Sequence, residues 1–147
     1  MQIISLGKAT PEYKPLMDHW RKMIKPKLIE HELVCRKNLP PEQLKKEEAS
    51  MILGYISKNS KLVALDPRGK EIDSEQLASY LQKTTDAGRE VVFVIGGAYG
   101  LDKSIIDSAD LVLSLSKMTM PHLLAKLVLI EQIYRAQTIA AGHPYHK

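Results

Sequence analysis

The chain has 147 residues, a formal net charge of +4 and one cysteine, Cys35. This length is enough for one domain with a buried core, and a single cysteine excludes an internal disulfide, which fits a reducing compartment. No apolar run is long enough to cross a bilayer and the first residues do not form a secretory signal, so we expect one cytoplasmic domain over residues 1–147 without membrane contact.

The first part of the chain predicts two strands and two helices. The strands are predicted over residues 2–6 and 27–35. Between them, Thr10 is a candidate N-cap and Pro11 suits the first helical position. A second helix is predicted over residues 40–58. The apolar residues at helical spacing, which we expect to be core, are Tyr13, Leu16, Met17, Trp20, Met23 and Ile24 in the first helix and Leu44, Met51 and Tyr55 in the second.

The rest of the chain predicts three more strands and two helices. The strands are predicted over 61–66, 90–95 and 111–115, and the sequence DPRG at 66–69 predicts a turn. Ser74 is a candidate N-cap for the first of the two helices, which is predicted to run to about Ala87, with Gly88 as its stop. The second begins at Pro121 and ends near Gly142. Its apolar residues cover more than one face, so it is either deeply buried or shared with another subunit.

This alternation of strands and helices predicts an α/β fold with a mostly parallel sheet flanked by helices on both faces. In such sheets, ligands bind at the carboxyl ends of the strands. Three loops leave strand ends in the second half of the chain: Leu65–Gly69, Gly96–Leu101 and Ser116–Pro121. If their strands are neighbours, the three loops meet at one site.

The glycine cluster in this region does not match the common nucleotide motifs. Gly97 and Gly100 have the spacing of the dinucleotide fingerprint, but Ile95 stands where its first glycine belongs, and no acidic residue follows at the required distance. A P-loop motif is absent, which disfavours a nucleotide hydrolase. By spacing alone, the glycines indicate a tight turn.

Five motifs occur in order in the second half of the chain. They are LDPRGK (65–70), VIGGAYGL (94–101), SLSKMTMPH (114–122), EQIYRA (131–136) and GHPYHK (142–147). Together with the opening IISLGK and the overall length, this set resembles the ribosomal RNA large subunit methyltransferase H family. These are small SPOUT-class enzymes that methylate N3 of a pseudouridine in bacterial 23S rRNA.

The resemblance carries further expectations. It implies a SPOUT-type fold with a C-terminal trefoil knot, which periodicity alone cannot predict. It also implies S-adenosylmethionine as the methyl donor, a homodimer built on the knotted region, and 23S rRNA in the assembled ribosome as the substrate, with no DNA. The residues expected to bind the cofactor are Leu65, Gly96, Gly97, Ser116, Lys117, Met118, Thr119, Met120 and Pro121. For the two methionines, ordinary core packing is the alternative.

Methylation of an imide nitrogen requires loss of its proton, so a base or a stabilising cation is expected near the target. The resemblance implies that the tail reaches the substrate, which makes Tyr145, His146 and Arg135 the predicted catalytic residues. The alternatives are fraying of the tail and an ion pair of Arg135 with Glu131. The other candidates are His122, for which a structural role is the alternative, and Lys147. Because no cysteine or acidic residue accompanies His143 and His146, no metal site is expected.

The sequence leaves the roles of two sets of basic residues undecided. Lysine and arginine outnumber acidic residues in the first quarter, and Lys22, Lys25, Arg36 and Lys37 are candidates for docking RNA. At Lys126 the family usually has arginine, whose planar fork lysine cannot reproduce. The change is tolerable if this residue contacts RNA phosphate, and it puts activity in doubt if this residue holds a specific carboxylate or a base edge. This departure leaves open a non-catalytic dimeric protein that binds RNA or the ribosome with the same fold.

Overall fold

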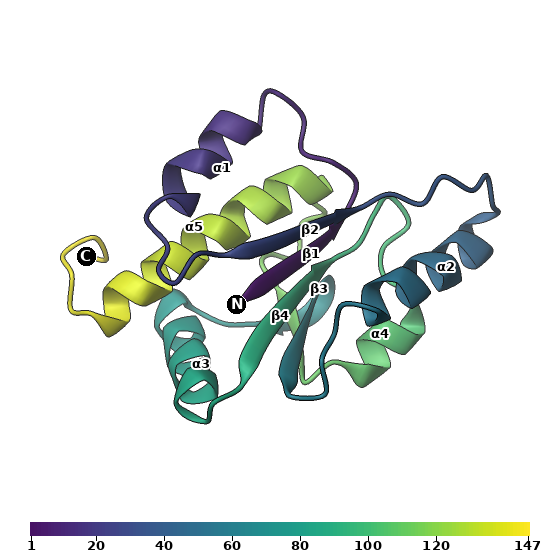
Figure 1. The fold of residues 1–147 in the computed structure, drawn as a ribbon. Helices are drawn as coiled ribbons and strands as arrows, with labels where there is room; N and C mark the ends of the chain where they lie inside the picture. Colours follow the sequence, from purple (N-terminus) through teal and green to yellow (C-terminus); the bar gives the residue numbers. More distant parts are fainter.

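A computed structural model describes all of residues 1–147 as five strands and five helices in strict alternation (Figure 1). The strands form one parallel sheet in the order β2-β1-β4-β3-β5, which confirms the predicted α/β fold class. The trefoil knot stays a prediction of the resemblance. The elements are β1 (Gln2–Leu6), α1 (Lys14–Arg21), β2 (Ile29–Leu33), α2 (Pro41–Leu53), β3 (Ser60–Glu71), α3 (Ser74–Asp86), β4 (Glu90–Ile95), α4 (Lys103–Ser108), β5 (Leu111–Ser114) and α5 (His122–Ala140).

Helices cover both faces of the sheet (Figure 1). Helices α1, α3 and α5 pack on one face, and α2 and α4 pack on the other. Successive side chains of a strand point to opposite faces. In β4, Val91 and Phe93 therefore pack under α3 and α5, while Val92 and Val94 face α2 and α4. Burial on both faces explains why the central strand is a continuous apolar run.

Two helices in the first half are shorter than predicted. Helix α1 begins at Lys14, and Thr10 does not cap it: the Thr10 carbonyl accepts the N–H groups of Tyr13 and Lys14, and its hydroxyl caps nothing. Helix α2 ends at Leu53 instead of reaching residue 58. The predicted core of these helices is also partly wrong: Met17 and Ile24 are buried, but Leu16, Met23 and Tyr55 are exposed.

In the second half, the segment 66–69 is predicted to end its strand, but β3 continues through it to Glu71. Leu113 of β5 pairs with both Leu65 and Lys70, so residues 66–69 bulge out of the ladder as a turn within a longer strand. Helix α3 is capped by Asp73 rather than by Ser74. Helix α4 is not predicted from the sequence. None of the helices is both long and apolar enough to cross a membrane.

Candidate functional site at the carboxyl edge of the sheet

The three predicted loops do meet, because β4, β3 and β5 are neighbours in the sheet. They surround a cavity of about 770 Å³ at the carboxyl ends of these strands. All of the predicted cofactor residues line it except Lys117, which points away and pairs with Glu71 at 3.8 Å. The start of α5 completes the wall with His122 and Ala125.

The glycine loop follows β4 and turns tightly on itself. The Gly100 N–H donates to the Gly97 carbonyl at 3.1 Å, and Gly100 has a positive φ of 75°. A Cβ added at Gly96 would lie 2.8 Å from the backbone of Gly100, so only glycine permits this close approach. At Gly96, Gly97 and Gly100 the loop therefore presents backbone groups to the cavity, while Ala98 and Tyr99 also line it.

The β3 bulge contributes the only acid–base pair that lines the cavity, Asp66 and Arg68. Asp66 is buried, and its carboxylate accepts hydrogen bonds from the Arg68 backbone N–H at 2.9 Å and from its guanidinium at 2.8 Å. The hydrogen bond from Arg68 holds the pKa of the Asp66 carboxyl below its usual range despite burial. The sequence predicts the loop, but these two side chains were not predicted as site residues. Their position at a strand end is the signal that marks them.

The third loop links β5 to α5 and includes Ser116, Met118 and Pro121. The Ser116 hydroxyl accepts the N–H of Met118 at 3.0 Å, while the Met118 side chain is exposed beside the cavity. Pro121 occupies the N-cap of α5 and provides no side-chain cap. His122 is half-buried at the cavity, and its Nε2 lies 2.9 Å from the position that a Cβ on Gly7 would take.

The predicted catalytic residues of the tail do not lie at this cavity. His122 begins α5 at the cavity, whereas Tyr145 and His146 follow the far end of this 19-residue helix. The helix spans about 27 Å. His146 lies 3.8 Å from Glu75, and its Nδ1 is buried without a partner.

The tail is nevertheless docked, not frayed. The Tyr145 hydroxyl donates to Glu131 at 2.9 Å, and the Arg135 guanidinium lies 4.7 Å from the centre of the Tyr145 ring. The same ring packs against Trp20 and Tyr134. Arg135 also pairs with Glu131 at 2.7 Å, which is the intrahelical ion pair expected as its alternative.

These contacts affect the protonation of Tyr145 and Arg135. Burial, followed by the hydrogen bond to Glu131, raises the pKa of the Tyr145 phenol. The hydrogen bond to Glu131 likewise raises the pKa of Arg135. Both side chains therefore keep their protons and act as donors at neutral pH. As placed here, Tyr145 is a poor proton acceptor.

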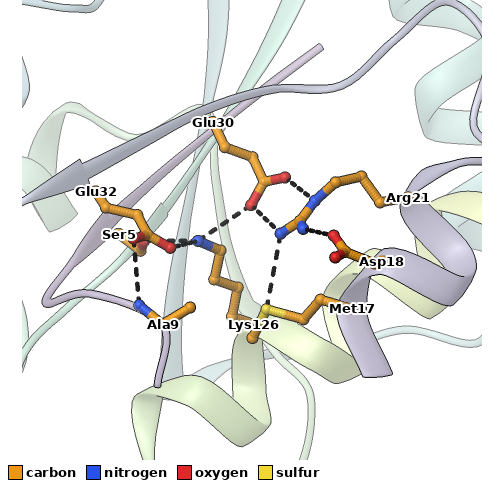
Figure 2. Close-up of polar contacts among 8 residues, drawn as sticks. All are labelled: Ser5, Ala9, Met17, Asp18, Arg21, Glu30, Glu32 and Lys126. Carbon is orange, nitrogen blue, oxygen red and sulfur yellow. Dashed lines mark hydrogen bonds and ion pairs between the residues drawn. The ribbon is translucent and has the colours of Figure 1, made fainter. Parts of the chain in front are cut away.

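Lys126 is buried, and Figure 2 shows it pointing toward side chains of the sheet edge. Its Nζ lies 2.8 Å from Glu32 and 3.1 Å from Glu30, and it donates to the Ser5 hydroxyl at 3.2 Å. Of the two roles left open for this residue, contact with RNA phosphate is therefore wrong for this structure, and Lys126 holds specific carboxylates. No group of three or more metal-ligating side chains is found.

Comparisons with known proteins agree with this architecture. A family model described as a predicted SPOUT methyltransferase matches residues 1–146. Similar proteins named ribosomal RNA large subunit methyltransferase H occur in Anaeromyxobacter sp. (strain Fw109-5), with 38% identity over 100% of this chain and 99% of that protein, and in Acidiphilium cryptum, with 50% identity over 73% of this chain and 68% of that protein.

Solved structures share the fold at low sequence identity. A probable methylase family protein from Haemophilus influenzae Rd KW20 matches with a TM-score of 0.56 and 13% identity over 99% of this chain and 70% of that chain. The SpoU methyltransferase AviRb from Streptomyces viridochromogenes, in complex with AdoMet, matches with a TM-score of 0.51 and 16% identity over 95% of this chain and 58% of that chain. At these identities the likeness is one of fold.

Proposed function

This chain belongs to the SPOUT methyltransferases and, among them, to the ribosomal RNA large subunit methyltransferase H family, and we propose that it transfers a methyl group from S-adenosylmethionine to N3 of a pseudouridine in 23S rRNA of the assembled ribosome. The observation that carries the proposal is the cavity of about 770 Å³, where the three strand-end loops meet. Its volume lies in the range of small-molecule sites.

The cavity has the chemistry that this cofactor requires. S-adenosylmethionine has no phosphate, and the cavity offers no phosphate cradle, because the only arginine that lines it is paired with Asp66. The glycine loop provides backbone donors and acceptors for an adenine edge at Gly96 and Gly97. The third loop and β3 add apolar walls through Leu115, Met120 and Leu65.

When bound, the cofactor supplies an electrophilic methyl group on a sulfonium, which leaves readily. The chain's own task is to hold the target base in line with that methyl group and to stabilise the base as its imide proton leaves. In this proposal, Arg135 supplies positive charge and Tyr145 a hydrogen-bond donor, both held by Glu131. His146 is the proposed proton acceptor, and its Nδ1 has no hydrogen-bond partner within this chain.

These roles require a homodimer, because in one chain the tail and the cavity lie at opposite ends of α5. We propose that the tail of one copy completes the cavity of the other. The exposed Leu124 and the half-buried Leu127 and Val128 provide apolar surface on α5 for such a contact. This use of α5 explains why its apolar residues cover more than one face.

Methyl transfer is tested directly with radiolabelled S-adenosylmethionine and ribosomes that lack the modification. We expect label in 23S rRNA, at one pseudouridine when the labelled nucleotide is mapped. Free 23S rRNA and isolated large subunits serve as comparison substrates and should accept less label. Label at another nucleotide, or none, would refute the proposed reaction.

The alternative function, a non-catalytic scaffold that binds RNA or the ribosome, was left open because lysine replaces the usual arginine at position 126. Because Lys126 is buried against Glu30 and Glu32, its replacement of the usual arginine does not alter the cavity surface. Calorimetry separates the two functions: the enzyme requires measurable binding of S-adenosylmethionine to the purified protein, and its absence would favour the scaffold.

A further inference from the structure

A single lysine occupies the buried stripe of α5 where an apolar residue is expected. Leu123, Lys126, Ile130 and Ile133 follow one another at helical spacing, and all four are buried. The ammonium group of Lys126 is fully excluded from solvent. A buried charge is retained only where it is paired and hydrogen-bonded, so its partners indicate what it does.

The partners come from the edge of the sheet. Glu30 and Glu32 are two residues apart on β2, so both side chains point to the face that α5 covers. Ser5 of β1, paired in register with Glu32, supplies the third acceptor. A lysine ammonium has three donors: Lys126 donates hydrogen bonds to Glu32 at 2.8 Å and to Ser5 at 3.2 Å, and it forms an ion pair with Glu30 at 3.1 Å.

The same carboxylates extend the network to α1 and to the loop before it (Figure 2). The second oxygen of Glu32 accepts the backbone N–H of Ala9 at 3.2 Å. Glu30 accepts from the Arg21 guanidinium at 2.9 Å, and Arg21 also pairs with Asp18. Lys126 therefore joins α5 to β1, β2 and α1 through a connected set of charged groups.

This anchor lies next to the cavity. His122, one turn before Lys126, and the adjacent Ala125 both line it. The N-terminus of α5 has no side-chain cap, because Pro121 occupies the N-cap position. The other polar side-chain contacts from α5 to the rest of the chain lie further along, from Glu131 to Tyr145, Gln132 to Ser74 and Gln137 to Lys25. Lys126 is thus the polar attachment of the helical part of the cavity wall.

We propose that Lys126 is a positioning residue for methyl transfer: it anchors the first turns of α5 to the sheet and so holds the helical wall of the cavity in the form that binds the methyl donor. The inference rests on the proposed function, since it assigns the donor to this cavity. Apolar packing alone holds a helix less strictly in register than two directed hydrogen bonds and an ion pair to two strands. Loss of the ammonium group also leaves two half-buried carboxylates side by side without their shared counter-charge, which favours movement of the helix away from them.

The test compares Lys126→Met with Lys126→Arg and with a control, Lys103→Met. Lys103 forms an exposed ion pair with Asp107 on α4, across the sheet from α5. Each protein is titrated with S-adenosylmethionine by calorimetry, well below its unfolding temperature. We expect Lys126→Met to weaken binding by about tenfold or more, since small displacements of a site have large effects. Lys126→Arg should bind within about threefold of the wild type because its guanidinium can hold both carboxylates.

Hydrogen exchange at the amides of residues 126–130 gives a second readout that needs no ligand. These amides should exchange at least about tenfold faster in Lys126→Met, while those of β4 keep the wild-type rate. If Lys126→Met does not fold, Glu32→Gln replaces it, with roughly threefold weaker binding and a smaller change in exchange at the same amides.

The outcomes separate this inference from the proposed function. Wild-type protein that does not bind S-adenosylmethionine overturns the proposed function, while the exchange measurement still tests the anchor. A folded Lys126→Met protein with wild-type affinity overturns the positioning role. An equal loss of affinity in Lys103→Met overturns it as well, because the effect would then not depend on the α5 anchor.

Discussion

Gly96 and Gly97 are adjacent, yet a methyl group at their two α-carbons would meet different surroundings. At Gly96 it would lie 2.8 Å from Gly100 and 2.9 Å from Leu101, both backbone atoms that cannot yield without a change in the turn. At Gly97 the nearest atom is the Cβ of Leu6 at 3.5 Å, which is an ordinary contact. The fold thus requires glycine at position 96, whereas Gly97 is available to contact a ligand.

This difference predicts opposite outcomes for two alanine substitutions. Gly96→Ala should lower the free energy of unfolding by about 1–3 kcal/mol because the turn is overpacked. Gly97→Ala should change it by less than about 0.5 kcal/mol, yet weaken S-adenosylmethionine binding, because in the proposed function the cofactor contacts the backbone of Gly97 closely. Urea unfolding and calorimetry check the pair. Wild-type affinity in Gly97→Ala would contradict the assignment of Gly97 to the cofactor.

Glu32 gives a prediction about pH. Burial raises the pKa of its carboxyl, but the hydrogen bonds from Lys126 and the Ala9 N–H, with the charges of Lys126 and Lys14, outweigh this effect and lower it. A carboxyl whose pKa is lowered in the folded state stabilises the protein above its unfolded pKa, about 4.3. That stability is lost as the pH falls through the folded value.

Replacing Lys126 with methionine should reverse this sign. Burial, the largest single influence, is then opposed only by the Ala9 N–H and the charge of Lys14, and repulsion from Glu30 is added to it, so we expect the pKa of Glu32 to rise above its unfolded value. The folded state then binds more protons, and the variant should gain stability as the pH falls from about 7 to 5. Thermal unfolding of the variant and the wild type across this range is the measurement. Parallel curves would show that Lys126 does not control the protonation of Glu32.

At the scale of elements, helices α1 and α3 begin in different ways. Helix α3 has a capping box: Asp73 accepts the Gln76 N–H at 2.7 Å, and the Gln76 side chain accepts the Asp73 N–H at 3.1 Å. At α1, the similar sequence signal at Thr10 yields only a turn before the helix. A capping residue in the sequence therefore indicates a helix nearby without fixing its first residue.

Asp73→Ala and Thr10→Ala form a matched pair of substitutions. Asp73→Ala should lower the free energy of unfolding by about 1 kcal/mol, since the Gln76 N–H loses its side-chain acceptor. Thr10→Ala should cost less than about 0.5 kcal/mol because its hydroxyl caps nothing. Urea unfolding at neutral pH measures both. An equal loss in the two variants would contradict the caps seen here.

At the scale of the whole molecule, the proposed dimer predicts complementation between two defective proteins. Gly97→Ala impairs the cavity, and Tyr145→Phe removes the hydroxyl that Glu131 holds. If the tail of one copy serves the cavity of the other, a mixed dimer has one complete site. Refolding the two variants together should restore about a quarter of wild-type activity, given random pairing into a two-fold dimer. If the refolded mixture is no more active than the separate variants, the tail and the cavity of the same chain form the site.

The basic residues of the first quarter lie in two places instead of one patch. Arg36 and Lys37 are exposed after the carboxyl end of β2, at the edge of the sheet that carries the cavity. Lys22 and Lys25 are exposed after α1, and the Lys25 backbone contacts Gln137 near the end of α5. Within the proposed dimer, both groups are available to one RNA, since the tail of one copy approaches the cavity of the other.

Electrostatic docking predicts a strong dependence on salt. Raising monovalent salt from about 50 to 200 mM should weaken ribosome binding by about tenfold or more, since each neutralised phosphate releases a counterion. Affinity for S-adenosylmethionine should remain nearly constant, because the two charged residues that line the cavity, Asp66 and Arg68, already neutralise each other. Sedimentation with ribosomes and calorimetry at the two salt concentrations give the comparison. Ribosome binding that does not change with salt would contradict the proposed electrostatic docking surface.

The sequence by itself determined the features that depend on local pattern. The alternation of apolar runs and helical periods predicted a parallel α/β sheet. The continuous apolar run predicted both ends of β4 correctly, and the strand-end loops predicted the location of the cavity. Each of these follows from neighbours in the chain, whose spacing matches the period of a strand or a helix.

Only the tertiary structure decided which distant groups meet. Lys126 finds Ser5, 121 positions earlier, and the tail docks on Trp20 of α1 rather than at its own cavity. Residues 66–69 remain part of β3 because β5 pairs with the strand on both sides of the bulge. Burial of a charge, the docking of a terminus and the continuation of a strand all depend on packing between segments far apart in sequence, which no local period encodes.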